Sequence, residues 1–252
     1  MAIEVFNRKE IKYRVSADTA QKLTERLSQY IQADAYSREG ASYLICNIYY
    51  DTPQNELIRR SLDKPRYKEK LRLRSYGLKN PDEKVFLEIK KKYNGLVNKR
   101  RTSILLGDAY RFLETGHFTN SDGSETLPPF MNAQVTKELT YFINHYENIA
   151  PALYLAYDRA AFFAKDDPET RITFDKNIIV RRYDLGLHYG NYGDKLLDDD
   201  ERIMEIKVGR AFPLWLIRAL SELKIFPQSF SKYGTEYAGH FKAGAQNAFL
   251  EE

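Results

Sequence analysis

A two-residue alternation of apolar and charged side chains recurs along most of this chain and limits the folds open to it. In residues 4–15, for example, Ile11 and Tyr13 alternate with Glu10 and Lys12. Because successive side chains point to opposite faces of a β-strand, this pattern predicts strands with one apolar and one charged face. Further strands are predicted near residues 41–51, 65–76, 84–93, 96–105, 153–164, 170–182 and 201–208. Most links between them are short, which predicts an antiparallel sheet, open or closed into a barrel.

Helical spacing replaces this alternation in a few segments. Ser16 can cap a helix that runs to about Tyr30, with Ile31 still in its apolar stripe. Other helices are predicted near residues 108–116, 130–148 and 212–223. These helices would pack outside the sheet or at its ends, so the predicted fold class is α+β.

The composition indicates one folded domain over residues 1–252. A hydrophobic fraction of 43% is enough to build a core. The longest apolar runs are too short to span a bilayer, and the first 15 residues lack the apolar core of a signal peptide. The single cysteine, Cys46, shares a strand face with Leu44 and Ile48, which predicts a buried thiol. We therefore expect a soluble, cytoplasmic protein without a membrane segment of its own.

The charged strand faces carry mostly arginine and lysine, with an occasional carboxylate. Each face could be an ordinary solvated one, since antiparallel sheets usually expose one side to water. However, cations directly opposite one another on neighbouring strands repel by about 0.2–1 kcal/mol. A bound polyanion would remove this cost, and Mg²⁺ or Mn²⁺ could bridge the carboxylates to it. The phosphate-binding patterns GxxxxGK[ST] and GxGxxG are absent from the sequence.

The charged motifs follow one another in the order found in VTC-type domains of the CYTH, or triphosphate tunnel metalloenzyme, superfamily. The resemblance extends from Glu4 to about Tyr237. It rests on Arg8-x-Glu10-x-Lys12-Tyr13, Tyr49-Tyr50-Asp51-Thr52, Arg72-x-Arg74, Glu88-x-Lys90, Lys99-x-Arg101, Arg171-x-Thr173-x-Asp175, Glu205-x-Lys207 and Ser231-Lys232-Tyr233.

This resemblance implies a closed, eight-stranded antiparallel tunnel that binds triphosphate and a divalent metal, Mn²⁺ or Mg²⁺. It assigns catalytic roles to Lys12, Arg72, Arg74 and Lys232. It assigns phosphate binding to Arg8, Lys90, Lys99, Arg101, Arg159, Arg171 and Lys207, and metal binding to Glu205, Glu10 and Glu88. Lys232 lies outside the predicted strands, so we expect a flexible lysine that closes over the tunnel mouth. Arg8 replaces the first glutamate of the superfamily's ExExK motif, which places more of the metal site on Glu205.

The resemblance favours ATP-dependent synthesis of inorganic polyphosphate by transfer of the γ-phosphate to a growing chain. One alternative is metal-dependent hydrolysis of tripolyphosphate or a nucleoside triphosphate. Another is a non-catalytic module that binds polyphosphate or nucleic acid. Carboxylates that recur among the cations fit nucleic acid poorly, so no nucleic-acid partner is expected. The expected ligands are ATP or another triphosphate and polyphosphate, with a membrane protein as a potential partner.

Overall fold

A computed structural model describes residues 9–37, 41–94, 96–209 and 211–248. Ten strands form one sheet, and eight of them follow in the order β1-β10-β8-β7-β3-β4-β5-β6. The short strands β2 and β9 pair with β7 and β8. The strands are β1 Lys9–Ser16, β2 Ile31–Ala33, β3 Tyr43–Asp51, β4 Tyr67–Tyr76, β5 Lys84–Tyr93, β6 Leu96–Leu105, β7 Ala150–Ala164, β8 Arg171–Arg181, β9 Asp194–Lys195 and β10 Glu201–Val208. The helices are α1 Ala17–Leu27, α2 Glu56–Leu62, α3 Leu106–Thr115, α4 Ala133–His145, α5 Leu214–Glu222 and α6 Lys232–Ala248.

The predicted α+β class with an antiparallel sheet is confirmed. The ladders between described residues form an open path that ends at β1 and β6, instead of the expected closed ring of eight ladders. The alternation could not distinguish the two forms, because both give the same two-residue pattern along each strand.

The chain divides into two compact units. Unit 1 comprises residues 1–4, 45–156 and 180–194, and unit 2 comprises residues 5–44, 157–179 and 195–252. Strands β3, β7 and β8 contribute residues to both units. That residues 1–252 act as a single domain stays a prediction.

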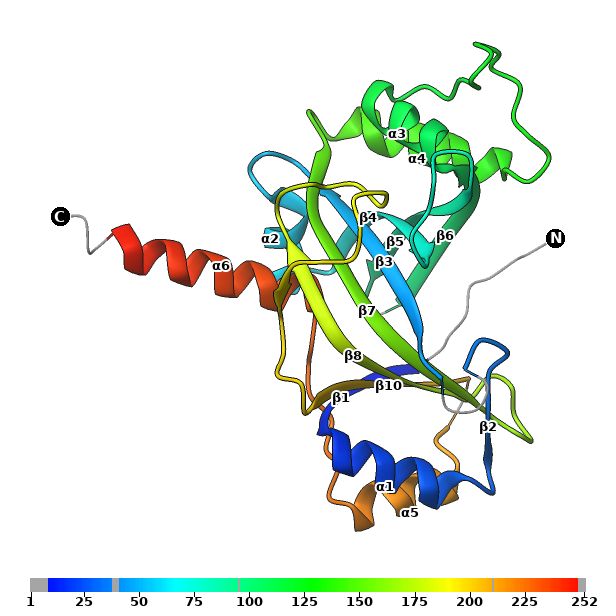
Figure 1. The fold of residues 1–252 in the computed structure, drawn as a ribbon, viewed down its shortest axis with the longest axis vertical. Helices are drawn as coiled ribbons and strands as arrows, with labels where there is room; N and C mark the ends of the chain where they lie inside the picture. The colour runs from blue at the N-terminus through cyan, green and yellow to red at the C-terminus, as the bar shows by residue number, and fades with distance from the viewer. Residues whose placement is uncertain (1–8, 38–40, 95, 210, 249–252) are drawn as a thin grey trace. The chain divides into compact units, whose positions relative to one another are not determined.

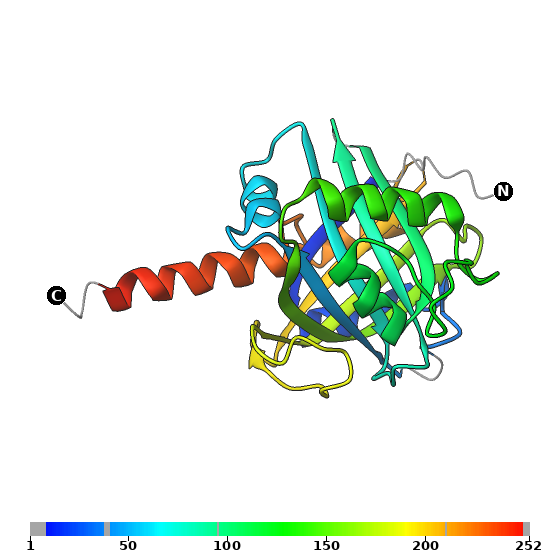
Figure 2. The same ribbon diagram turned by 90° about the horizontal axis from the view of Figure 1, so that it is seen from above.

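Unit 1 is built on a meander of β4, β5 and β6, and Asn94 lies in the turn between β5 and β6. Asn94 has a positive φ of 45°, as asparagine at such turns often does. Leu71, Leu73, Leu87 and Ile89 are completely buried on the apolar face of this meander. Helices α3 and α4 lie along it (Figure 2), with Phe112 and Leu139 buried. The alternation thus separates a helix-covered face from a charged face.

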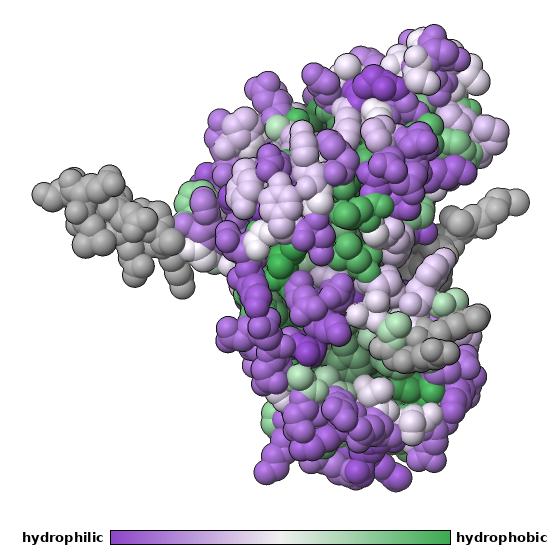
Figure 3. All heavy atoms as spheres, viewed as in Figure 1, coloured by the Kyte–Doolittle hydropathy of each residue, from purple (hydrophilic) through white to green (hydrophobic). Residues whose placement is uncertain are grey.

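Unit 2 repeats this separation with β1, β10 and part of β8. Helices α1 and α5 pack side by side against the strands (Figure 1). Their core includes Leu23 and Leu216 from the helices and Met204 and Ile206 from β10. The outer side of α1 is polar, and Figure 3 shows hydrophilic side chains over it. The opposite, charged face of the strands is therefore left for polar chemistry.

Several boundaries differ from the sequence analysis. Helix α1 begins after the predicted cap, where the Ser16 side chain accepts a hydrogen bond from the Thr19 N–H. It ends at Leu27, however, and Ile31 lies in β2, where it pairs with Ala164. Helix α2 was not predicted; the buried Asp51 carboxylate accepts hydrogen bonds from its Leu57 and Ile58 N–H groups. In the described part of the chain, no helix is both long and apolar enough to cross a bilayer.

Candidate functional site

The charged face of unit 2 is organised in rows of residues that are register partners on β1, β10 and β8. Lys12 lies opposite Glu205, and Glu205 lies opposite Thr173. The next row contains Glu10, Lys207 and Arg171. With Arg159, Asp175 and Lys232, these residues form what we call the unit 2 cluster. Lys12 thus lies opposite the carboxylate Glu205 and Lys207 opposite the carboxylate Glu10, whereas Lys207 and Arg171 are two cations opposite each other.

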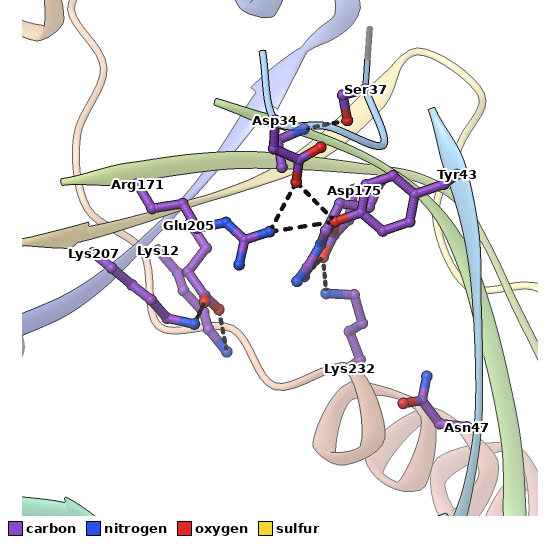
Figure 4. Close-up of polar contacts among 12 residues, drawn as sticks. Lys12, Asp34, Ser37, Tyr43, Asn47, Arg171, Asp175, Glu205, Lys207 and Lys232 are labelled. Carbon is purple, nitrogen blue, oxygen red and sulfur yellow. Dashed lines mark hydrogen bonds and ion pairs between the residues drawn. The ribbon is translucent and has the colours of Figure 1, made fainter. Parts of the chain in front are cut away.

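Glu205 is the central carboxylate of these two rows (Figure 4). Its oxygens lie 2.6 Å from Lys207 Nζ and 3.8 Å from Lys12 Nζ. Glu10 approaches the same two ammonium groups, at 3.7 Å from Lys207 and 3.9 Å from Lys12. Burial raises the pKa of the Glu205 carboxyl, but Lys207, Lys12 and Arg159 outweigh burial and hold it well below its usual range. Glu205 is therefore an anionic oxygen donor at neutral pH.

Asp175 anchors a second set of contacts in unit 2. Its buried carboxylate accepts two hydrogen bonds from Arg159, from Nε at 2.6 Å and from Nη2 at 2.8 Å. A third hydrogen bond, of 2.6 Å, comes from Lys232 Nζ. Burial raises the pKa of Asp175, but Arg159 and Lys232 lower it to about 2. The bidentate geometry fixes the Arg159 guanidinium on the charged face.

The structure corrects the expectation of a flexible, exposed Lys232. This lysine is the first residue of α6, and only 13% of its side chain is exposed. Its ammonium bonds to Asp175 and lies 4.5 Å from the centre of the Tyr157 ring. This burial could not be predicted from local sequence patterns, because Asp175 is 57 residues away along the chain.

The Arg171 guanidinium makes its hydrogen bonds to described residues through Nη2. Its Nη2 donates to Asp34 at 3.2 Å and to the Tyr43 hydroxyl at 3.3 Å (Figure 4). Asp34 and Tyr43 were missed by the sequence analysis, because both lie beyond the charged strand patterns. The Arg171 Nε is buried and has no hydrogen-bond partner in the part of the chain that the structure describes. Arg171 therefore combines a structural ion pair with a free donor group.

The charged face of unit 1 has rows of its own on β3, β4, β5 and β6. Tyr49, Arg72, Glu88 and Arg101 are register partners in one row. The neighbouring row contains three lysines, Lys70, Lys90 and Lys99. With Asn47 and Arg74, these residues form what we call the unit 1 cluster. Lysines directly opposite one another disfavour the sheet unless an anion lies nearby.

Glu88 is the buried anion of the unit 1 cluster. Arg72 Nε donates to its Oε2 at 2.6 Å, and Lys99 Nζ donates to its Oε1 at 3.3 Å. Arg101 Nη1 lies 3.9 Å from Oε1. Burial raises the pKa of Glu88, whereas the surrounding cations, Arg72 foremost, hold it well below its usual range. Both oxygens already face cations, which suits Glu88 to orienting the basic side chains.

Asn47 and Tyr49 are further members of this cluster that the sequence analysis missed. Arg74 is buried and donates from Nε to Asn47 Oδ1 at 2.8 Å. The Tyr49 hydroxyl accepts a hydrogen bond of 3.5 Å from Arg72 Nη1. Burial raises the pKa of the Tyr49 phenol, but Arg72, Lys70 and Arg74 lower it to about 7. Asn47 and Tyr49 are two residues apart on β3, and this spacing was the available signal. Cys46, which precedes Asn47, is buried as predicted.

The predicted site residues thus fall into two clusters. Lys12, Glu10, Arg159, Arg171, Glu205, Lys207 and Lys232 lie in unit 2, and Arg72, Arg74, Glu88, Lys90, Lys99 and Arg101 lie in unit 1. Arg8 is outside the described residues. Among the residues that are described, no group of three or more His, Cys, Asp or Glu side chains could hold a metal ion. The assignment of these residues to substrate and metal stays a prediction.

We expect Arg72→Lys to weaken tripolyphosphate binding about tenfold. Lysine keeps the positive charge but lacks the planar guanidinium, whose N–H groups can contact two phosphate oxygens at once. Binding can be measured by isothermal titration calorimetry. Arg100→Lys is a matched control, since Arg100 pairs with Glu138 on the other face of the same meander. If Arg72→Lys binds tripolyphosphate with the affinity of the wild type, the Arg72 guanidinium does not make bidentate hydrogen bonds to phosphate.

Known proteins confirm the fold and reveal the family. A candidate adenylate cyclase from Bacillus halodurans has a TM-score of 0.53 at 16% identity, covering 90% of this chain and 94% of that chain. A candidate adenylyl cyclase from Hippeastrum, whose structure is described as revealing a dominant triphosphatase activity, has a TM-score of 0.51 at 16% identity, covering 91% and 95%. A comparison with curated proteins finds no match. The VTC domain matches residues 7–241, so the chain belongs to the VTC-domain family.

Proposed function

We propose that this protein synthesises inorganic polyphosphate by transferring the γ-phosphate of ATP to the end of a growing chain. Family membership supports action on a triphosphate. The observation that favours a polymer is the length of the cationic face in unit 1. A site for a triphosphate alone needs only a compact group of cations.

This face carries a stripe of cations that continues past the Arg72 row. On β4, Arg74, Arg72, Lys70 and Lys68 share one face, and Lys68 lies opposite Lys92 of β5. The seven residues from Lys68 to Arg74 span about 20 Å, which exceeds the reach of one triphosphate. Burial lowers the pKa of Lys68, and Lys92 and Lys64 lower it further. Crowded cations at this end of the stripe are suited to a linear polyanion.

The carboxylates of the unit 2 cluster fit a divalent cation. Glu205 is anionic, and Glu10 approaches the same lysines, so two hard oxygen donors are available. Mg²⁺ and Mn²⁺ are commonly held by one or two carboxylates together with phosphate oxygens. Glu205 and Glu10 would therefore hold the metal, which would neutralise charge on the transferred phosphoryl group. We assign Glu88 to orienting Arg72 instead.

The side chains of both clusters are suited to positioning and charge neutralisation. A terminal phosphate oxygen is already anionic near neutral pH, so the attacking group requires alignment and a positive environment more than a general base. Arg72, Arg74, Lys90, Lys99 and Arg101 would supply this environment in unit 1, and Lys12, Arg159, Lys207 and Lys232 in unit 2. Glu88 or Asn47 contacts Arg72, Arg74, Lys99 and Arg101, and Glu10, Glu205 or Asp175 contacts the four cations of unit 2.

Hydrolysis of a triphosphate is the second candidate. The similarity to the Hippeastrum structure, described as revealing a dominant triphosphatase activity, favours it. In that reaction a water molecule attacks, and a carboxylate such as Glu10 would have to orient it.

Incubation with ATP and Mn²⁺, followed by gel separation of the products, tests the proposal. Chains that lengthen with time are expected. Orthophosphate as the sole product would favour hydrolysis, and unchanged ATP would favour a non-catalytic binding module. A double variant, Lys68→Gln with Lys92→Gln, should make shorter product chains, because these two lysines lie at the end of the cation stripe away from Arg74.

Tyr49 offers a direct measure of the positive potential in unit 1. Because its pKa is lowered to about 7, its tyrosinate absorbance should titrate near neutral pH. Bound tripolyphosphate adds negative charge and should raise this pKa, so absorbance at neutral pH should fall on binding. Tyr49→Phe isolates the signal, and Tyr50→Phe is the control, since burial raises the pKa of Tyr50. Titration of Tyr49 near its ordinary value of 10.0 would contradict the expectation.

A further inference from the structure

Thr173 is a buried residue in the centre of the unit 2 cluster, and neither the family resemblance nor the proposed reaction assigns it a role. It lies on β8, and its register partner on β10 is Glu205. Only 4% of its surface is exposed. Its Oγ1 is buried and has no hydrogen-bond partner among the described residues.

A buried hydroxyl without a partner is unusual. Such a group costs about 1–3 kcal/mol in other proteins, and most buried polar side chains avoid the cost by pairing. Glu205, its neighbour on β10, is already bonded to Lys207 and faces Lys12. Valine has the same shape as threonine and would fill this position in a core without the penalty. The hydroxyl therefore favours a partner that the described residues do not supply.

The adjacent row contains a second buried polar group without a described hydrogen-bond partner. Arg171 is two residues from Thr173 on the same face of β8, and no described residue pairs with its buried Nε either. An arginine Nε–H can only donate, and a threonine hydroxyl can donate as well. Both groups thus call for an acceptor. The register partner of Arg171 is the cation Lys207, so the acceptor is favoured to be an anion.

We propose that the Thr173 hydroxyl is a further substrate-binding group, which donates a hydrogen bond to a phosphate oxygen held by the unit 2 cluster. This inference rests on the proposed function, because it takes the ligand to be a polyphosphate. It adds a neutral donor beside the cations of the cluster. A neutral donor can contact an oxygen without adding to the repulsion between Lys12 and Lys207.

The hydroxyl would then serve binding at the expense of stability, which gives the test two readouts of opposite sign. Thr173→Val should raise the melting temperature of the ligand-free protein by about 2–4 °C, because it removes an unsatisfied buried group. The same change should weaken tripolyphosphate binding about tenfold, since a hydrogen bond to a charged oxygen is lost. Thr173→Ser keeps the hydroxyl and should retain most of the affinity.

Thr170→Val is the matched control. Thr170 is completely buried and directly precedes β8, but its Oγ1 donates to Asp167 at 2.7 Å. Its replacement should lower the melting temperature and leave tripolyphosphate binding unchanged. Affinities would be measured by calorimetry on the full chain, first with a chelator and then with Mn²⁺.

Three outcomes would overturn the inference. Unchanged affinity in Thr173→Val would mean that the hydroxyl does not contact the ligand. A lower melting temperature in that variant would mean that the hydroxyl has a structural partner. Weaker binding only when Mn²⁺ is present would assign the hydroxyl to the metal and its water. If the wild type binds tripolyphosphate but makes no chains, the proposed polymerase fails while this inference stands.

Discussion

Replacing Glu205 by glutamine should reduce turnover of ATP by about 10²–10³-fold, with little change in the fold. Glutamine keeps the shape of the side chain but removes the negative charge that Lys207 and Lys12 surround. The proposed metal site would lose its principal oxygen donor, and the two ammonium groups would lose their shared partner. The loss should be greatest at limiting Mn²⁺, where initial rates are most sensitive to metal affinity.

Glu201→Gln provides the matched control for this experiment. Glu201 lies on the same strand, β10, and pairs with Arg14 instead of a residue of the cluster. Its replacement should leave the rate within about twofold, because exposed ion pairs contribute little. Wild-type turnover by Glu205→Gln at limiting Mn²⁺ would remove Glu205 from the metal site.

Asp175→Asn should have the largest effect on stability, lowering the free energy of unfolding by about 3–5 kcal/mol. The carboxylate is 1% exposed, and its partners Arg159 and Lys232 are also largely buried. Asparagine would leave both cations without a counter-charge in a poorly solvated position. Urea unfolding followed by circular dichroism measures the change. Asp158→Asn, at a partly exposed position on β7 whose carboxylate accepts from Asn177, should change stability by less than about 0.5 kcal/mol.

Asp175 also predicts an acid transition. Its pKa is about 2 in the folded protein, compared with an ordinary value of 3.8. Because the folded pKa is the lower one, the stabilisation is complete above about pH 4 and disappears as the pH falls through 2. The wild type should lose about 2 kcal/mol from this carboxyl over that range, and Asp175→Asn should not. Equal acid sensitivity in the two proteins would show that Asp175 is not the buried counter-ion.

The local pattern of the sequence was sufficient to predict most strands and their faces. The hairpin of β5 and β6 and the cap at Ser16 depend on residues that are close together along the chain, so short-range chemistry specifies them. Two-residue alternation also identified the basic residues that share a charged face with Glu205 or Glu88. Helix α2 and strand β2 escaped prediction because each is short and depends on a distant element or a buried side chain.

The sequence alone determined which residues lie on the charged faces; only the tertiary structure decided which of them pair. Lys232 shows the difference. A lysine outside the predicted strands is expected to be solvated, yet its side chain is largely buried and bonds to Asp175. Similarly, only the structure places Arg72, Lys99 and Arg101 around the two oxygens of Glu88, which is the basis for proposing Glu88 as an orienting group. That no described residue pairs with the buried Thr173 hydroxyl could not be predicted from the sequence. The physical reason is that alternation is a property of one strand, whereas ion pairs and unsatisfied donors depend on the order and register of strands far apart in the chain.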